Sequence, residues 1–210
     1  MASETTDVLF ERFGPRYRLF VTITVLLGTV SAMVTTTIVN VAIPDIMGAF
    51  GIGQDQAQWF MTGALAAMTV GMLLNAWLIR NFGQRSTFIG ALTGFVLSLV
   101  LAGATPNETV LIFCRVVQGC VAGILQPLAI YTLYRVFPAE QKGRAMGFFG
   151  FSVILGPALG PTLGGLLIDL FNWRYIFYVP LPVAIAGILL DRKSTRLNSS
   201  HMSESRMPSS

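Results

Sequence analysis

The chain has 210 residues, of which 53% are hydrophobic and only 11% are charged. Soluble domains carry about 25% charged residues, so this composition excludes an ordinary soluble protein and predicts an integral membrane protein. The net charge of +4 lies in particular loops and forms no patch of interleaved basic and aromatic residues, which argues against nucleic-acid binding. Cys114 and Cys120 fall on opposite sides of one predicted helix, which favours buried thiols over a disulfide or a metal site.

Six apolar segments follow one another, and each is predicted to be a membrane-spanning helix. Crossing about 30 Å of hydrocarbon takes roughly 20 residues, which most segments reach, the last being somewhat short. The predicted fold class is all-α, with a tail over residues 1–18, a helix bundle over residues 19–190 and a loop over residues 45–58. The segments are approximately Leu19–Ile43, Trp59–Ile79, Ser86–Ala104, Val110–Tyr134, Ala145–Leu170 and Tyr175–Leu190.

Basic residues alternate from one predicted loop to the next. The amino-terminal tail, the turn after the second segment and the loop after the fourth hold Arg12, Arg16, Arg18, Arg80, Arg85, Arg135, Lys142 and Arg144. The loops on the other side hold only Arg174. Because cytoplasmic loops retain positive charge, both ends of the six-helix region are predicted to be cytoplasmic, in the inner (plasma) membrane.

Residues 191–210 change character abruptly. They are rich in serine and lack periodicity, which predicts disorder. They also resemble translated vector read-through, so we interpret them as non-native and expect the native chain to be cut near Leu190. A genuine cytoplasmic linker is the alternative.

A stripe of small residues marks the fifth predicted helix. Gly156, Gly160 and Gly164 recur at every fourth position, and Pro157 and Pro161 stand beside two of them. In water this would be a poor helix, since Gly costs about 1 kcal/mol and Pro about 3 kcal/mol in a helix interior. In lipid, small residues let helices approach closely. The stripe is therefore a packing seam, and it is also a candidate for shaping a transport path.

Polar residues inside predicted spans are candidates for chemistry. Arg115 stands about five residues into an apolar span, where a charge costs about 2.5 to 3.5 kcal/mol on insertion scales and normally faces a cavity or a partner. It could bind an anionic group or tune a protonatable partner. Alternatively it could snorkel to the outer interface or contact carbonyls at a helix end. Gln118, one turn further, and Asn40 could line a path or form interhelical hydrogen bonds.

None of the ten acidic residues lies in the middle of a predicted span. Asp169, at the outer end of the fifth span, is a candidate ion-pair partner of Arg174. Proton coupling usually needs a titratable group in the pathway. Three explanations stay open: the acid lies in a missing half, a residue at a helix end such as Asp45 or Asp169 serves, or the protein is not a conventional proton antiporter.

Two stretches resemble motifs of a known family. Arg115, Gln118 and Gly119 form an Arg-x-x-Gln-Gly pattern that resembles the fourth-helix motif of major facilitator superfamily transporters. The Gly-Pro-x-x-Gly-Pro-x-x-Gly-Gly run that ends at Gly165 resembles the antiporter motif of that superfamily.

Two further stretches resemble a subfamily. Residues 36–44 and 172–177 are similar to the end of the first helix and the start of the sixth in the fourteen-span drug:proton antiporters, the multidrug resistance protein B and QacA type. The resemblance covers roughly residues 17–190. It implies the amino-terminal six-helix half of an efflux pump, built as two inverted three-helix repeats, with the carboxy-terminal half absent.

The resemblance also implies site residues and partners. The residues expected to serve transport and coupling are Arg115, Gln118 and Asn40. The antiporter motif comprises Gly156, Pro157, Gly160, Pro161, Gly164 and Gly165. A cytoplasmic gate is expected at Arg80, Gly83 and Arg85. The expected substrate is a hydrophobic or amphipathic small molecule, with protons as coupling ion, membrane lipid around the helices and a periplasmic adaptor as a candidate partner. No cofactor or metal is implied.

Two positions depart from the family pattern. Thr35 stands where these pumps often carry an acidic residue in the first helix. Arg80 stands where the superfamily favours Asp, before Gly83. The usual charge relay at the cytoplasmic gate is therefore expected to be rewired.

Two other functions compete with proton-coupled efflux by alternating access. One is an uptake permease of the same fold, and the other is a non-transporting membrane module that binds a partner. Without a second half the chain is not expected to complete a transport cycle. An intramembrane enzyme is not expected, because the sequence lacks Gly-x-Ser-x-Gly and His-Glu-x-x-His and has no His in any predicted span.

Overall fold

The computed structural model describes the backbone of residues 6–190 and side chains from residue 18 onward. The predictions for residues 1–5 and 191–210 lie outside the described residues. Within the described part, six segments are long and apolar enough to cross a membrane. The elements are α1 (Thr6–Phe50), α2 (Gln54–Phe82), α3 (Gln84–Ala104), α4 (Glu108–Val136), η1 (Ala139–Gln141), α5 (Lys142–Leu170) and η2 (Trp173–Phe177), which leads into a helix over residues 180–190.

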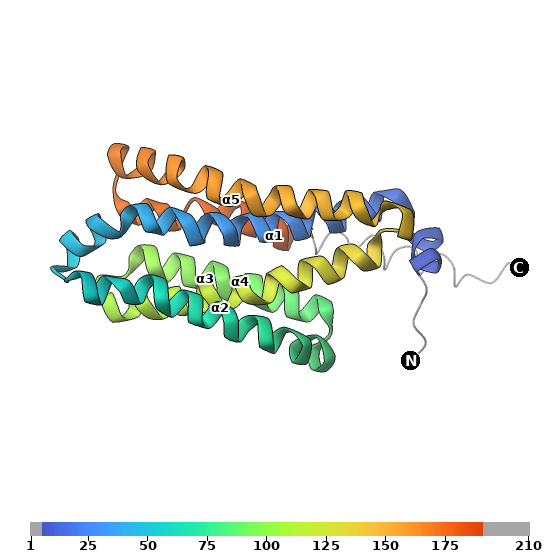
Figure 1. Cartoon of the computed structure of the whole chain (residues 1–210), viewed down its shortest axis with the longest axis horizontal. Helices are drawn as coiled ribbons and strands as arrows, with labels where there is room; N and C mark the ends of the chain where they lie inside the picture. The colour runs from blue at the N-terminus through green and yellow to red at the C-terminus, as the bar shows by residue number, and fades with distance from the viewer. Residues whose placement is uncertain (1–5, 191–210) are drawn as a thin grey trace, which may run out of the picture.

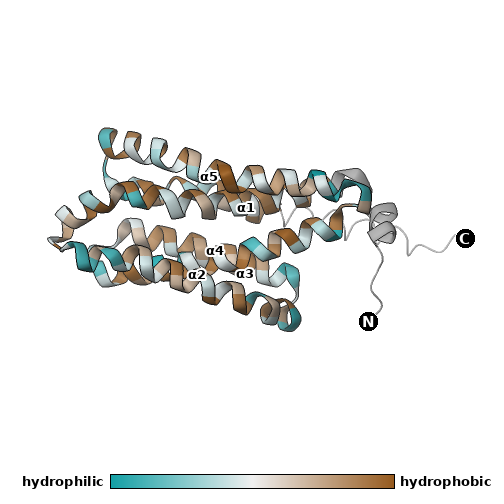
Figure 2. Cartoon of the chain, in the orientation of Figure 1, coloured by the Kyte–Doolittle hydropathy of each residue, from teal (hydrophilic) through white to brown (hydrophobic). Residues whose placement is uncertain are grey.

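The helices run up and down and form an elongated bundle (Figure 1). In this view α5 lies along α1, while α2, α3 and α4 form the other layer. Brown apolar residues dominate the length of the helices, and teal polar residues concentrate near the turns (Figure 2). The turn between α2 and α3 and the segment between α4 and α5 lie at one end, here called the basic end.

The helix pairing shows an internal repeat. The two most extensive pairs are α2 with α4 and α1 with α5. The first three helices correspond to the second three, so that α1 corresponds to α4 and α2 to α5. Under this correspondence the α2–α4 pair becomes the α5–α1 pair. Two inverted three-helix repeats would give this pairing, and the all-α six-helix fold class is confirmed.

The first loop is much shorter than the sequence predicts. Residues 45–58 were expected to be a loop, but α1 continues through Pro44 to Phe50 and only residues 51–53 separate it from α2. The reason is tertiary packing: Ile46 is fully buried, and the Phe50 ring lies 5.7 Å from that of Trp173. This burial outweighs the helix-breaking tendency of Pro44. Gly51, at φ 66°, then makes the turn.

The glycine stripe of α5 packs on α1. A Cβ atom added at Gly156 would collide with Met33, and one added at Gly160 would lie 2.9 Å from Thr37 Cβ and 3.1 Å from Ile38 N. One added at Gly164 would approach Ile38 to 3.1 Å. The geometry thus shows the stripe to be a close-packed seam between two helices. Gly165 has open space around its Cβ position and does not belong to the seam.

A second glycine seam, which was not predicted, lies between α2 and α4. A Cβ atom at Gly119 or Gly123 of α4 would collide with the backbone carbonyl of Ala64 or Met68 on α2. Gly71 of α2 is equally close to the carbonyl of Cys120. The spacing of four between Gly119 and Gly123 is a Gly-x-x-x-Gly pattern, which could have revealed this seam.

Candidate functional site

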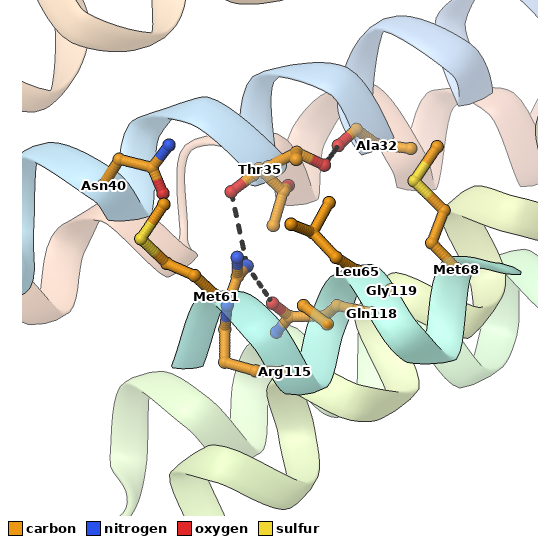
Figure 3. A pocket seen from close by; sticks show the side chains of 11 residues that line it. Ala32, Thr35, Asn40, Met61, Leu65, Met68, Arg115, Gln118 and Gly119 are labelled. Atoms are coloured by element: carbon orange, nitrogen blue, oxygen red, sulfur yellow. Dashed lines mark hydrogen bonds between the residues drawn. The ribbon is translucent and has the colours of Figure 1, made fainter. Parts of the chain in front are cut away.

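Arg115 lies inside the bundle and is only 2% exposed. Its Nη1 donates to the Thr35 carbonyl oxygen at 3.3 Å and to Gln118 Oε1 at 3.0 Å, as Figure 3 shows. Its Nε donates to the Phe60 carbonyl oxygen at 3.4 Å. The snorkelling alternative is therefore wrong, since the guanidinium points to the neighbouring helices α1 and α2.

Local structure explains why Arg115 reaches both helices. The Asn107 side chain caps α4 by accepting from Thr109 N at 2.8 Å, which sets the helix start roughly 10 Å before Arg115. One turn after Arg115, Gly119 brings the backbone of α2 at Ala64 against α4. This close approach places the carbonyl of Phe60, one turn earlier on α2, within reach of the arginine.

Arg115 borders a cavity of about 100 Å³ between α1, α2 and α4. The lining combines polar groups with flexible apolar side chains, as expected for an amphipathic ligand. It comprises Ala32, Thr35, Thr36, Asn40, Met61, Ala64, Leu65, Met68, Arg115, Gln118 and Gly119. The structure therefore brings together the three residues predicted for transport and coupling, Arg115, Gln118 and Asn40 (Figure 3). The apolar lining on α2 was not predicted, because no motif marked it.

The charge of Arg115 meets only neutral acceptors in the described part of the chain. Two are backbone carbonyls, and the third is the Gln118 amide. Thr35, at the position where the resembling pumps often carry an acid, contributes its carbonyl to Arg115, while its hydroxyl donates to the Ser31 carbonyl oxygen at 2.8 Å. A buried charge is stabilised only when hydrogen bonds or an opposite charge replace its hydration.

The predicted gate residues lie at the basic end, away from this cavity. Gly83 is the only residue between α2 and α3, with φ 81° and ψ 157°. Other residues reach this region at a cost of about 1 to 3 kcal/mol, so the turn requires glycine. Arg80 and Arg85 are exposed in the adjoining helix ends. Next to the turn, Gln84 Nε2 donates to Thr132 Oγ1 of α4 at 2.6 Å, which ties the turn to the bundle.

A larger cavity of about 420 Å³ also opens at the basic end. It lies between the start of the first span, the segment that joins α4 to α5, and the first turns of α5. Its lining is basic and apolar: Arg18, Leu19, Thr22, Ile23, Leu26, Phe137, Gln141, Arg144 and Phe148. The two cavities share no residue, so they are separate features of the bundle.

The prediction that Asp169 and Arg174 form an ion pair is wrong, and both residues lie in the described part of the chain. Arg174 Nη1 instead donates to the carbonyl oxygen of Thr105 at 2.6 Å and to that of Gly103 at 3.4 Å. Its guanidinium also lies 4.5 Å from the Trp173 ring centroid. The carbonyls at the end of α3 lack helical partners, so they compete well for the cation.

Comparison with known proteins assigns the chain to a family. The sequence matches the Major Facilitator Superfamily over residues 8–204. It is 38% identical over 168 residues to the uncharacterized MFS-type transporter YhcA of Bacillus subtilis, covering 80% of this chain and 32% of YhcA. It is 37% identical over 170 residues to the probable multidrug resistance protein EmrY of Escherichia coli, covering 81% of this chain and 33% of EmrY.

A third relative is the multidrug resistance protein B homolog of Mycobacterium tuberculosis, 38% identical over 164 residues, with 78% of this chain and 30% of the relative covered. The chain thus spans about a third of the length of the curated relatives it matches. The matches to the multidrug resistance proteins lie in their amino-terminal half.

Two solved structures share the fold. The proton:xylose symporter XylE bound to 6-bromo-6-deoxy-D-glucose superposes with a TM-score of 0.71 at 17% identity, covering 86% of this chain and 45% of XylE. Inward-open XylE from Escherichia coli gives a TM-score of 0.74 at 16% identity, covering 84% and 48%. At these identities the likeness shows the fold alone.

Proposed function

The chain belongs to the Major Facilitator Superfamily, and we propose that it forms the amino-terminal bundle of a transporter that exports hydrophobic or amphipathic small molecules. The observation that carries this proposal is the amphipathic cavity between α1, α2 and α4, bordered by the buried guanidinium of Arg115. Relatives named as multidrug resistance proteins support export of varied compounds.

The proposed mechanism is alternating access, in which rigid helix bundles rock around a site near the middle of the membrane. Two glycine seams support the rigidity, because backbones in close contact resist sliding. In this proposal Arg80, Gly83 and Arg85 form the gate at the basic end, where Gly83 allows a one-residue turn.

Protons are the proposed coupling ion, and their acceptor is proposed to lie in a second bundle. The described acids Asp45, Asp55, Glu108, Glu140 and Asp169 lie near helix ends, and none borders the Arg115 cavity. The matched relatives are much longer than this chain, so they have room for a second bundle. A periplasmic adaptor is part of the same proposal and rests on resemblance.

The bundle is proposed to lie in the inner membrane with its basic end in the cytoplasm. The positive residues of the basic end support this orientation. An alkaline phosphatase fused after Gln141 is expected to stay inactive, because it would remain in the cytoplasm, whereas one fused after Asn107 should be exported and active. An active fusion at Gln141 with an inactive one at Asn107 would reverse the orientation.

Export itself can be tested in cells that lack their own drug pumps. We would express the complete genomic reading frame that contains residues 1–190 and load the cells with a fluorescent amphipathic dye. Energised cells should accumulate less dye than cells with an empty vector, and a protonophore should abolish the difference. Higher accumulation would indicate uptake and contradict export. Equal accumulation at verified expression would contradict transport of that dye class.

A further inference from the structure

The hydrogen bonds of Arg115 leave part of its guanidinium unused. A guanidinium has five N–H donors. In the structure Nε and Nη1 contact Phe60, Thr35 and Gln118, and the described residues offer no acceptor to Nη2. Arg115 also lines the cavity, so an acceptor placed there can reach the guanidinium.

Gln118 supplies a second, independent observation. It is 2% exposed and lines the same cavity. Its Oε1 accepts from Arg115, which leaves the amide nitrogen Nε2 as a donor, and that atom is buried without a hydrogen-bond partner among the described residues. A buried donor without a partner is unfavourable. Both residues line the cavity, and each carries a donor for which the described residues supply no acceptor.

Charge decides which kind of acceptor fits. The cavity lining contains one cation, Arg115, and no carboxylate, because Thr35 stands where the resembling pumps often carry an acid. A neutral carbonyl would satisfy hydrogen bonds but leave the charge uncompensated in a medium of low polarity. An anion would satisfy both, and hydrogen bonds between charged groups are the stronger kind.

We infer that the cavity between α1, α2 and α4 binds an anionic group, a carboxylate or a small inorganic anion, held by Arg115 and the Gln118 amide. Thr36 and Asn40 provide further polar lining, and Met61, Leu65 and Met68 would contact the apolar part of an organic acid. Anion binding itself is independent of transport. The idea that the anion belongs to a transported compound rests on the proposed function.

Thermal unfolding of the purified chain in nonionic detergent tests the inference. The probes are sodium benzoate, its uncharged analogue benzamide, and sodium bromide, each titrated at equal concentrations in the same low-salt buffer. Benzoate should raise the unfolding temperature saturably, because a ligand that binds only the folded state stabilises it. Benzamide should not. Stabilisation by benzoate identifies an organic carboxylate as the ligand; stabilisation by bromide alone identifies an inorganic anion.

Three variants locate the binding. Arg115→Gln removes the charge and should weaken the apparent Kd at least tenfold. Thr35→Asp adds a carboxylate to the cavity lining, at the residue whose carbonyl accepts from Arg115, and should abolish anion binding. This variant tests the site independently of whether Arg115→Gln folds. Arg135→Gln removes an exposed charge from the far end of α4 and should bind as the parent does. Equal stabilisation by benzamide, or unchanged binding in Thr35→Asp, would overturn the inference. That failure would leave the export experiment standing, because binding is measured without transport.

Discussion

Gly160→Ala is expected to lower the free energy of unfolding by about 1 to 3 kcal/mol, the usual effect of overpacking a well-packed interior. The added methyl group would lie 2.9 Å from Thr37 Cβ and 3.1 Å from the backbone nitrogen of Ile38, neither of which can move without shifting α1. Helix propensity alone would raise the free energy of unfolding, since alanine is favoured over glycine in a helix by about 1 kcal/mol. The steric effect should dominate, because Thr37 Cβ and Ile38 N are both fixed by the backbone of α1.

Gly165→Ala is the matched control. Gly165 belongs to the same resembling motif, but its Cβ position has nothing within 4 Å. The substitution should therefore keep or slightly raise stability. The measurement is unfolding of each variant in mixed micelles at rising denaturing-detergent fraction, followed by far-ultraviolet circular dichroism. Equal stability of the two variants would show that Gly160 does not hold α5 against α1.

Much of the fold could be predicted from the sequence because lipid constrains the chain strongly. Six apolar segments separated by short polar stretches leave little choice of architecture, and the superfamily that the motifs indicated is confirmed. The spacing of Gly156, Gly160 and Gly164 likewise predicted a close seam, which lies against α1. The apolar segments and the glycine spacing are both periodic and local patterns, so a single sequence is enough to predict the structure that they indicate.

The failures involve partners that are distant in the sequence. Pro44 predicted a helix end, but packing of Ile46 and of Phe50 on Trp173 extends α1 by nearly two turns. Asp169 was the nearest acid to Arg174 in sequence, yet the free carbonyls at the end of α3 are its partners. Charge spacing along the chain does not reveal such contacts.

The candidate site could be predicted only in part. Arg115, Gln118 and Asn40 were identified by motif and polarity, and they border one cavity. Their assigned roles in transport and coupling stay predictions. The acceptors of Arg115 could not be predicted, since two are backbone carbonyls, which every residue carries. Met61, Leu65 and Met68 escaped notice because an apolar side chain in a membrane helix faces lipid as often as a cavity.

Substrate is proposed to pass through the cavity bordered by Arg115, and Arg115→Ala tests this proposal. The substitution removes a buried cation and leaves Gln118 Oε1 without its donor. Each hydrogen bond to a charged group contributes about 1.5 to 3 kcal/mol, so export should fall at least tenfold. Membrane insertion should be intact, because the variant removes a charge that lipid disfavours.

The measurement is the initial rate of dye export from energised cells, at equal amounts of membrane-inserted protein. Arg115→Lys should retain part of the rate, since it keeps the charge but not the fork of donors. Arg135→Ala, which alters an exposed arginine at the far end of α4, should export like the parent. Export by Arg115→Ala should fall to the level of the empty vector. Undiminished export by Arg115→Ala, with Arg135→Ala equally active, would contradict it.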